Sequence, residues 1–378
     1  MKYFILQNTL APYRISLFNK LFESGMDIEL FYMDELERCR SWKIDYDSIK
    51  YPYTIDYNGY KGTIKGFDIY WNWGFIRRFI KEKDACIVLG GPWNFPDAIM
   101  ICLLKRLGII KNQLFFWSEA NYQTIGARKK NKLRDWLRSF VYSTPNSGII
   151  VPGKLAIESF RRWNIKVNNY IHLPNVIEEE IFLYASQEEH TFSILDTPPF
   201  FVLPVRLNEA IKGVINFFKS IGSSNIKKAH FYVLGDGPDE ELIRNFIFDN
   251  GYQDNIELCG FCSMKDVAKY YQKSDVLVLP SFSDPSPLSL VEGCCSKMPL
   301  LVSNRCGNHY ETIIDGQNGY IFNPDNADEI KTAFENILHN RAKWKEMGCI
   351  SRKLFEQNFE QKNVIPSFIK EISQSKYL

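Results

Sequence analysis

The sequence predicts an α/β protein with two Rossmann-like, doubly wound sheets in tandem. Short apolar runs alternate with longer amphipathic runs in both halves of the chain, which is typical of βαβ units with parallel strands. The alternation stops in a polar stretch, Tyr184–Pro199, and then restarts, so this stretch is expected to be a linker. The length of 378 residues agrees with two domains of ordinary size.

Each half supplies its own predicted elements, the strands as short apolar runs and the helices with apolar residues at three- and four-residue spacing. In the first half we expect strands at Tyr3–Leu6, Ile28–Tyr32, Ala85–Leu89, Leu114–Trp117, Gly148–Val151 and Asn169–His172, and helices at Tyr13–Ser24 and Asp97–Leu107. In the second half we expect strands at Phe200–Pro204, His230–Leu234, Val276–Leu279 and Leu300–Val302, helices at Ile211–Ile221, Glu240–Asn250 and Leu288–Ser296, and a helical tail at Ala327–Leu378.

The composition argues against several classes of protein. Lys plus Arg number 46 and Asp plus Glu 44, and this net charge of +2 disfavours a strongly basic nucleic-acid-binding protein and an acidic disordered chain. Lys105 and Arg106 interrupt the apolar stretch Ala98–Ile110 well short of the ~20 residues of a membrane span. Met1–Leu10 lacks the charged-then-apolar pattern of a signal peptide, so we expect a cytoplasmic protein.

The nine cysteines are expected to be reduced thiols, because most of them lie inside apolar runs. Cys259 and Cys262 have the C-x-x-C spacing of a zinc or redox site. No second pair or histidine cluster supplies further zinc ligands at matching spacing, and a thioredoxin-like motif should open a helix rather than follow a strand. We therefore interpret this spacing as coincidence and expect no metal site.

The stretch Asp275–Phe322 has the pattern most typical of a ligand site. Asp284 lies in the loop at the carboxyl end of a predicted strand, the edge where open α/β sheets bind ligands. Ser286–Ser289 opens the next helix, and backbone N–H groups at a helix N-terminus bind phosphate oxygens. Glu292, one or two turns further on, can accept hydrogen bonds from sugar hydroxyls. Asp284 could also cap this helix, so capping stays an alternative to a ligand contact.

Several segments in the second half resemble one enzyme family. The residues DVLVLPSFSDPSPLSLVEG at 275–293, PLLVSN at 299–304, GNHYE at 307–311 and DGQNGYIF at 315–322 resemble the C-terminal domain of retaining glycosyltransferases of family 4, which have the GT-B fold. Val205-Arg-Leu207 with Lys212-Gly213 and Val233–Pro238 resemble further motifs of that domain, and Leu173–Val176 resembles the lead-in to its interdomain linker. The resemblance is strong over about residues 200–325 and weak before 170.

This resemblance implies two Rossmann-like domains that face a central cleft. Residues 1–180 would form the acceptor-binding domain and residues 181–359 the nucleotide-sugar-binding domain, with a C-terminal helix at about 360–378 packed back onto the first. Arg206 and Lys212 would neutralise the donor diphosphate as its charge develops in the transition state. Glu292 would hold the ribose hydroxyls and Asp284 would face the sugar.

Two positions depart from the family pattern, because Asp284 stands where the family usually has Glu and Pro287 where Gly is common. The residues implied to bind the donor are Gly235, Gly237, Phe261, Pro287, Leu288, Ser289 and Glu292. From spacing alone, Arg206 and Lys212 could equally be a solvated pair, and the two glycines a tight turn without a ligand.

The first half is expected to recognise the acceptor. Three polar loops follow predicted strands there, and from them we take five acceptor-side residues, Pro12, Arg14, Trp93, Asn94 and Glu119. The family often has Gly-Gly in the first of these loops, where this chain has Asn8–Arg14, and a His where Glu119 stands. Glu119 could act as a base for the incoming hydroxyl or cap the next helix.

A basic amphipathic helix is predicted at Ala127–Tyr142. Its apolar face holds Leu133, Trp136, Leu137, Phe140 and Val141, and basic side chains surround them at Arg128, Lys129, Lys130, Lys132, Arg134 and Arg138. Such a helix could lie on an anionic membrane surface, or pack on the core with its basic face in solvent. Residues 1–180 hold 26 Lys and Arg against 19 Asp and Glu, a net charge of +7, whereas the rest of the chain has −5.

We therefore expect a metal-independent, retaining glycosyltransferase that uses a UDP- or GDP-sugar. It would move a hexose or N-acetylhexosamine to a hydroxyl of a glycan acceptor, lipid-linked, in the synthesis of surface polysaccharide or glycoconjugate. We expect it in the cytoplasm, with peripheral binding at the inner face of the membrane as an option, and without a nucleic-acid partner. Two alternatives stay open: a GT-B nucleotide-sugar epimerase or hydrolase, and a catalytically silent GT-B partner subunit.

Overall fold

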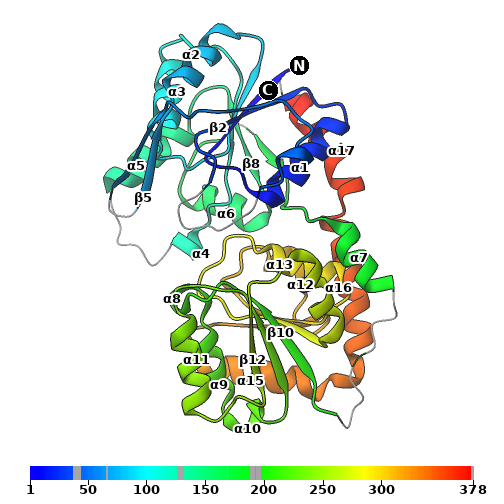
Figure 1. Ribbon diagram of the computed structural model, residues 1–378. Helices are drawn as coiled ribbons and strands as arrows, with labels where there is room; N and C mark the ends of the chain where they lie inside the picture. The colour runs from blue at the N-terminus through cyan, green and yellow to red at the C-terminus, as the bar shows by residue number, and fades with distance from the viewer. Residues whose placement is uncertain are drawn as a thin grey trace. The chain divides into compact units, whose positions relative to one another are not determined.

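The computed structural model describes residues 1–36, 44–64, 67–125, 132–167, 169–187, 192 and 197–375. These residues form two compact units, each with its own parallel sheet (Figure 1). The first unit contains residues 1–120 and the described residues of 128–174 and 362–378, and the second contains those of 121–127 and 175–361. The second unit thus begins ahead of the predicted boundary at 180/181, because helix α7 (Glu179–Gln187) packs on its helices α12 (Met264–Lys273) and α13 (Leu288–Cys295).

The first unit has a seven-stranded parallel sheet with the strand order β3-β2-β1-β6-β7-β8-β9. Its strands are β1 (Tyr3–Gln7), β2 (Ile28–Tyr32), β3 (Tyr53–Ile55), β6 (Cys86–Leu89), β7 (Leu114–Trp117), β8 (Ser147–Val151) and β9 (Tyr170–His172). Its helices are α1 (Pro12–Glu23), α2 (Trp73–Lys81), α3 (Pro96–Arg106), α5 (Lys132–Tyr142), α6 (Lys154–Arg162) and α17 (Gln361–Gln374). A separate antiparallel hairpin joins β4 (Tyr60–Ile64) to β5 (Phe67–Trp71).

The second unit has a six-stranded parallel sheet with the strand order β12-β11-β10-β13-β14-β15. Its strands are β10 (Phe200–Pro204), β11 (His230–Leu234), β12 (Ile256–Gly260), β13 (Val276–Leu279), β14 (Leu300–Ser303) and β15 (Gly319–Phe322). The helices not yet named are α4 (Tyr122–Ile125), α8 (Glu209–Lys212), α9 (Val214–Ile221), α10 (Ser223–Ile226), α11 (Glu240–Asp249), α14 (His309–Thr312), α15 (Ala327–His339) and α16 (Trp344–Asn358).

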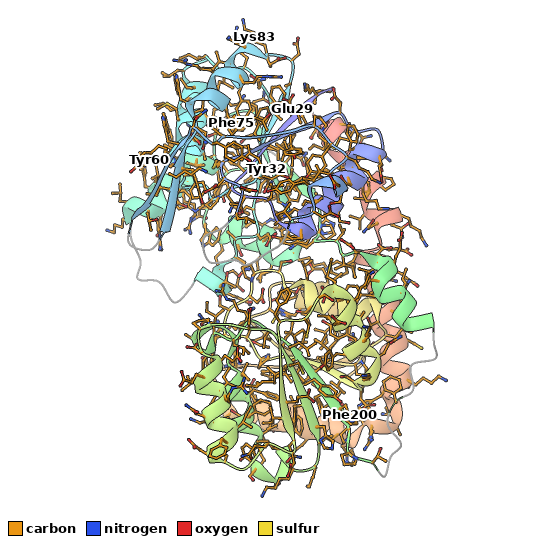
Figure 2. The ribbon with its side chains drawn as sticks, in the orientation of Figure 1. Glu29, Tyr32, Tyr60, Phe75, Lys83 and Phe200 are labelled. Atoms are coloured by element: carbon orange, nitrogen blue, oxygen red, sulfur yellow. The ribbon has the colours of Figure 1, made fainter. Side chains whose placement is uncertain are left out.

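The central strands are continuous apolar runs because helices cover both faces of each sheet. In the first unit, Phe4, Phe31 and Phe79 pack ring against ring with centroids 5.2–5.5 Å apart. Figure 2 shows Tyr32 and Phe75 among the side chains that fill the same unit. Burial of these aromatic rings stabilises the first unit.

Each sheet contains one topological switch point. In the first unit β1 lies between β2 and β6, and in the second unit β10 lies between β11 and β13. In each sheet, the strands that directly follow the first strand in the sequence lie on one side of it, and the later strands lie on its other side. Loops that leave adjacent strands in opposite directions open a crevice at the carboxyl ends, which is where open α/β sheets bind ligands.

The predicted strands are confirmed, most of them to within one residue at either end. The predicted helix Ile211–Ile221 is two helices, because Gly213 adopts a left-handed conformation with φ of +63° and separates α8 from α9. Tyr184–Gln187 of the predicted linker belongs to α7, and residues 188–191 and 193–196 lie outside the described residues. The helical tail is confirmed as α15, α16 and α17.

Helix α17 belongs to the first unit although it follows the whole of the second. The side chain of Gln113 donates to the carbonyl oxygen of Ser375 at 2.8 Å. The backbone N–H of His172 donates to the carboxylate of Glu371 at 3.2 Å. These bonds join the C-terminal helix to residues beside β7 and in β9.

Candidate functional site

The loops after β10 and β11 meet backbone to backbone in the second unit. The N–H of Leu207 donates to the carbonyl oxygen of Asp236 at 2.7 Å. A Cβ atom on Gly235 would lie 2.1 Å from the carbonyl oxygen of Val205, and one on Gly237 would lie 2.3 Å from that of Leu207. Gly235 also has a φ of +137°. Both positions require glycine because the two backbones touch there. The glycines therefore do more than form an isolated tight turn.

We expect Gly235→Ala to lower the free energy of unfolding by about 1–3 kcal/mol, the cost of a strained backbone position, or by more if the neighbouring loop must move. Chemical denaturation followed by circular dichroism measures this loss. Gly251→Ala is the matched control, since Gly251 also has a positive φ but no heavy atom within 4 Å of an added Cβ. An equal loss in the two variants would show that the loop contact contributes nothing.

Lys212, at the end of the short helix α8 after β10, and Asp284, in the loop after β13, form an ion pair. Their side chains are only 18% and 15% exposed. The N–H of Phe282 donates to the carbonyl oxygen of Ile211 at 2.8 Å and fixes the two loops side by side. Lys212 is therefore not a solvated surface lysine, and its ammonium group lies at the switch point of the sheet.

Asp284 does not cap helix α13, so this alternative is wrong. The helix begins at Leu288, its N-cap residue is Pro287, and no side chain accepts a hydrogen bond from the first turn there. The backbone of Asp284 is instead held by Gly307, whose N–H donates to the Asp284 carbonyl oxygen at 2.8 Å. The first turn of α13, with Leu288 and Ser289, begins four residues after Asp284.

Glu292 lies one turn further along α13 and is partly buried. Its carboxylate accepts a hydrogen bond from the hydroxyl of Tyr271 at 2.9 Å. Burial raises the pKa of Glu292 to about 7, and the bond from Tyr271 opposes that rise. Near neutral pH this carboxyl group is thus poised between its charged and neutral forms.

The other predicted donor residues lie on neighbouring loops of the same sheet edge. Arg206 is partly buried in the loop after β10, and Phe261 follows β12 with 68% of its surface exposed. Sequence reasoning missed Tyr271, which lies on α12 and is brought to Glu292 by the folding of the chain. A tyrosine on an amphipathic helix gives no pattern that distinguishes this role from ordinary packing.

The first unit has a cavity of about 350 Å³ at its own switch point. The loops after β1, β6 and β7 line it, and four predicted acceptor-side residues are among the lining: Arg14, Trp93, Asn94 and Glu119. Pro12 is not part of the lining. It is the first residue of α1, a position that suits proline because the N–H there would have no helical partner.

Arg14 and Glu119 form an ion pair with 2.6 Å between Nη2 and Oε1. The guanidinium group of Arg14 also lies 4.2 Å from the ring centroid of Trp117. The alternative that Glu119 caps the next helix is wrong, because the side chain of Asn121 accepts the hydrogen bond from the N–H of Thr124 at 3.0 Å. Sequence reasoning missed Trp117, which also lines the cavity.

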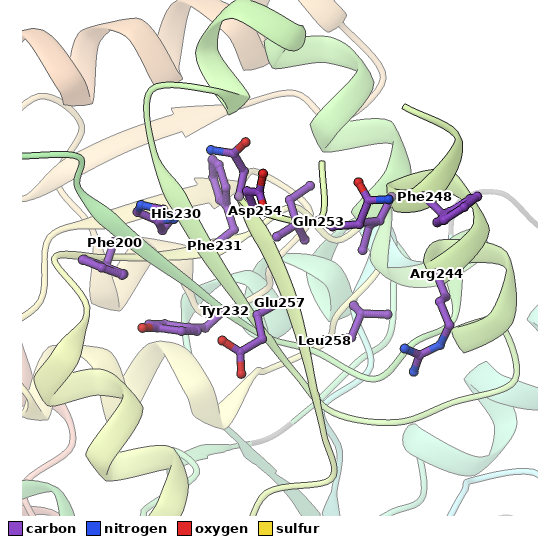
Figure 3. Close-up of a pocket in the computed structure, with 13 residues that line it drawn as sticks. Phe200, His230, Phe231, Tyr232, Arg244, Phe248, Gln253, Asp254, Glu257 and Leu258 are labelled. Atoms are coloured by element: carbon purple, nitrogen blue, oxygen red, sulfur yellow. The ribbon is translucent and has the colours of Figure 1, made fainter. Parts of the chain in front are cut away.

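A further cavity of about 540 Å³ lies at the opposite edge of the second sheet, at the amino ends of β10, β11 and β12 (Figure 3). The rings of Phe200 and His230 stack there with centroids 5.0 Å apart, and Tyr232 stacks on Phe200 at 5.6 Å. The segment that carries Arg206 and Lys212 leaves the other end of β10. This cavity is therefore separate from the candidate donor site.

Comparison with known proteins shows which proteins the chain is similar to. Residues 186–354 match the model of the glycosyl transferases, group 1. The chain is 29% identical over 274 residues to an uncharacterized glycosyltransferase of Methanocaldococcus jannaschii, a match that covers 72% of this chain and 71% of the relative. These matches show a glycosyltransferase whose residues 186–354 are similar to group 1. It is also 26% identical over 147 residues to the alpha-monoglucosyldiacylglycerol synthase of Acholeplasma laidlawii, which covers 39% of this chain and 34% of that protein.

The fold of the chain is GT-B, as the sequence predicted. The Anabaena protein HepE, solved in complex with UDP and glucose, superposes with a TM-score of 0.73 over 99% of this chain and 100% of that one, at 12% identity. Among the residues that the structure describes, no group of three or more His, Cys, Asp or Glu side chains is placed to hold a metal ion. No helix in the described part of the chain is long and apolar enough to cross a bilayer.

The basic amphipathic helix of the glycosyltransferase is described from Lys132 onward, as α5. Arg128, Lys129 and Lys130 lie outside the described residues. Leu133 and Trp136, assigned to the apolar face, are 72% and 62% exposed, whereas Arg138 is buried and its guanidinium lies 4.1 Å from the ring centroid of Trp163. The described helix thus presents apolar side chains to solvent at one end and packs on the unit at the other.

Proposed function

We propose that this chain is a retaining, metal-independent hexosyltransferase of family 4. It moves a hexose or N-acetylhexosamine from a UDP- or GDP-sugar to a hydroxyl of a lipid-linked glycan acceptor in surface polysaccharide or glycoconjugate synthesis. The observation that carries the proposal is the partly buried Lys212–Asp284 pair at the switch point of the second sheet, in which Asp284 lies four residues before the start of α13. A lysine ammonium group at this edge, together with the N–H groups at the start of α13, supports the binding of a diphosphate.

The donor half of the proposal follows from these groups. Lys212, Arg206 and the N–H groups of α13 stabilise the negative charge that develops on the diphosphate when its bond to the anomeric carbon breaks. Glu292 accepts hydrogen bonds from the ribose hydroxyls, and Asp284 contacts the sugar while it orients Lys212. The Anabaena protein with the same fold has been solved with UDP and glucose, which supports a nucleotide sugar as donor.

The acceptor half uses the cavity of the first unit. Glu119 accepts a hydrogen bond from the attacking hydroxyl, and the ion pair with Arg14 fixes the position of the carboxylate. The new bond forms on the face of the sugar from which the diphosphate leaves, and the proton of the acceptor hydroxyl passes to Glu119 or to the departing phosphate. One relative is named for synthesis of a monoglucosyldiacylglycerol, which supports a lipid acceptor.

The test is a screen of UDP- and GDP-sugars with and without polyprenyl-linked glycan acceptors, read by intact mass and by nucleotide release. We expect release that depends on the acceptor, together with a mass gain of one sugar on the acceptor. Release at the same rate without acceptor would favour the epimerase or hydrolase alternative. No release with any donor, from protein that still binds nucleotide, would favour the silent partner subunit.

Peripheral binding at an anionic membrane is part of the proposal. Besides Leu133 and Trp136 on α5, Leu103 and Leu107 at the end of α3 are exposed, and α3 packs beside α5. The side chain of Arg106 fixes this packing by donating to the carbonyl oxygen of Phe140 at 2.7 Å. Exposed apolar residues within residues 1–180, which have a net charge of +7, suit a surface of anionic lipid headgroups.

We expect the double variant Leu133→Ser, Trp136→Ser to bind phosphatidylglycerol-containing vesicles at least about 10-fold more weakly, because two apolar side chains no longer enter the lipid. Vesicle co-sedimentation at low and high salt measures the change. Phe248→Ser is the matched control, since Phe248 is equally exposed but lies on α11 of the second unit. Equal binding by the double variant and the unmodified protein would contradict this part of the proposal.

A further inference from the structure

Helix α12 brings a buried tyrosine hydroxyl to the candidate donor site of the second unit. Tyr271 is 0% exposed, and its hydroxyl donates to Oε2 of Glu292 on α13 at 2.9 Å. A buried hydroxyl is costly unless it is paired, and a phenylalanine would fill almost the same volume without that cost. The hydroxyl of Tyr271 therefore serves the carboxylate rather than the packing of the core.

Packing fixes the position of this hydroxyl. The ring centroid of Tyr271 lies 5.8 Å from that of Phe182 on α7, and Phe182 is 1% exposed. Helix α7 packs on both α12 and α13, so one helix holds both partners of the hydrogen bond in place (Figure 1). A side chain that close packing holds in one rotamer can orient the group to which it is bonded.

The two carboxylate oxygens of Glu292 have different surroundings. Oε2 accepts the bond from Tyr271, whereas Oε1 makes no hydrogen bond to any described residue and keeps accessible surface. An ionised carboxylate accepts hydrogen bonds at both oxygens, so Oε1 is available to a hydroxyl group of a ligand. A proton bound at Oε1 would turn this acceptor into a donor.

The charge of Glu292 is unfavourable for folding. Burial raises the pKa of Glu292 to about 7, and the bond from Tyr271 opposes this rise because the hydroxyl stabilises the charged form. An apolar side chain at this position would cost the fold less. Groups that weaken a fold in this way are concentrated at functional sites.

Among the described residues, Tyr271 is the one titratable side chain that shifts the pKa of Glu292, and burial is the other cause. The helices that pack against α13 carry further charged or titratable side chains, and none of them contributes to the shift. They include Glu179 and Glu180 on α7, His309 and Glu311 on α14, and Arg352 on α16. The protonation of Glu292 near neutral pH thus depends on the hydroxyl of Tyr271.

We propose that Tyr271 is a positioning residue for the nucleotide-sugar donor. Its hydroxyl holds the Glu292 carboxylate charged and oriented so that Oε1 accepts a hydrogen bond from a ribose hydroxyl of the nucleotide. The inference rests on the proposed function, because that function supplies the nucleotide. Tyr271 itself does not touch the ligand in this arrangement, since its hydroxyl is buried and already bonded to Oε2.

The test measures binding of UDP and of GDP to the full chain by titration calorimetry at pH 7 and pH 8.5. Tyr271→Phe removes the hydroxyl and keeps the ring, so Glu292 should be neutral in more of the molecules at pH 7. We expect the nucleotide that binds the unmodified protein to bind this variant about 5-fold more weakly at pH 7, and within about twofold at pH 8.5, where the carboxylate is charged again. Each ratio is taken at one pH, because the nucleotides titrate too.

Tyr252→Phe is the matched control, because Tyr252 is a buried tyrosine of the same unit whose ring packs on Phe246 of α11. It should leave nucleotide binding unchanged at both pH values. A double variant tests whether Tyr271 acts through Glu292. In protein that already carries Glu292→Gln, the addition of Tyr271→Phe should change the nucleotide affinity at pH 7 by less than about twofold, because no charge is left to hold.

Stability without nucleotide provides a readout that does not depend on the proposed function. Tyr271→Phe should lower the urea midpoint of unfolding more at pH 8.5 than at pH 5.5, because the hydroxyl stabilises the charged carboxyl group of Glu292 more than the neutral one. Unaltered nucleotide affinity in Tyr271→Phe, or an equal loss at pH 7 and pH 8.5, would overturn this inference and leave the proposed function standing. No binding of UDP or GDP to the unmodified protein would overturn the proposed function, and the donor role of Tyr271 with it.

Discussion

Replacement of Lys212 by alanine is expected to lower kcat/KM for sugar transfer by about 10²- to 10³-fold, as removal of one preorganised transition-state donor does in other enzymes. Lys212 is fixed at the sheet edge by its pair with Asp284. Its charge therefore needs no rearrangement when the diphosphate leaves. Acceptor-dependent nucleotide release at several donor concentrations separates the effect on kcat from that on KM.

The control for Lys212→Ala is Lys219→Ala, a lysine that is exposed on α9 of the same unit. Loss of Lys212 also leaves the Asp284 carboxylate without its cation, so the unfolding midpoint is measured beside the rate. The predicted loss of rate must persist at a temperature where both variants are fully folded. A kcat/KM within threefold of the unmodified protein would remove Lys212 from the catalytic assignment.

Glu292→Gln is expected to change donor binding and stability in opposite directions. The glutamine amide cannot accept two ribose hydrogen bonds as a carboxylate does, so we expect the donor KM at pH 8 to rise by about 10- to 100-fold, the value of a hydrogen bond to a charged group. The same change removes a partly buried charge. We therefore expect the variant to be more stable than the unmodified protein at pH 8.

The pKa of Glu292 determines how the stability difference between Glu292→Gln and the unmodified protein changes with pH. The pKa of Glu292 is about 7 in the folded chain and near 4.5 in the unfolded chain. Because folding raises the pKa, the stabilising effect of the protonated group is complete below pH 4.5 and is lost as the pH rises through 7. The advantage of Glu292→Gln should thus be of order 1–3 kcal/mol at pH 8 and vanish near pH 5.

Denaturation at pH 5, 6.5 and 8 measures this advantage directly. Glu257→Gln is the matched control, because Glu257 is exposed on β12 of the same unit. A stability difference that does not vary with pH would show that the carboxyl group of Glu292 is not perturbed by burial. A donor KM that stays constant would separately remove Glu292 from the ribose contact.

The strands were predictable because parallel strands covered on both faces are continuous apolar runs, such as Val276–Leu279. The sheet edge that holds the candidate site was predictable for the same reason, since the polar loops follow the carboxyl ends of those strands. The β4–β5 hairpin and α2 were missed, because they lie in a stretch rich in aromatic and charged residues without a clean period. The break at Gly213 depends on one left-handed residue.

Pairing between distant residues could not be predicted from local pattern. Lys212 meets Asp284 across 72 positions, and Arg14 meets Glu119 across 105. Asp284 and Glu119 both have sequence contexts that suit helix caps, and only the folded chain shows that neither is one. The apolar face of α5 was predicted from its spacing, but the exposure of Trp136 depends on which neighbours cover that face.

Because α17 is the last helix of the sequence but belongs to the first unit, the first unit is completed only at the end of synthesis. This helix is the last part of the first unit to leave the ribosome, after the entire second unit has been made. At about 5–20 residues per second, the incomplete first unit must therefore wait on the order of ten seconds or more for its final helix. During that interval the side chain of Gln113 and the N–H of His172 lack the partners that the C-terminal segment later supplies, so the nascent first unit exposes surface that chaperones can bind. Truncation just before α17 would make that transient state permanent.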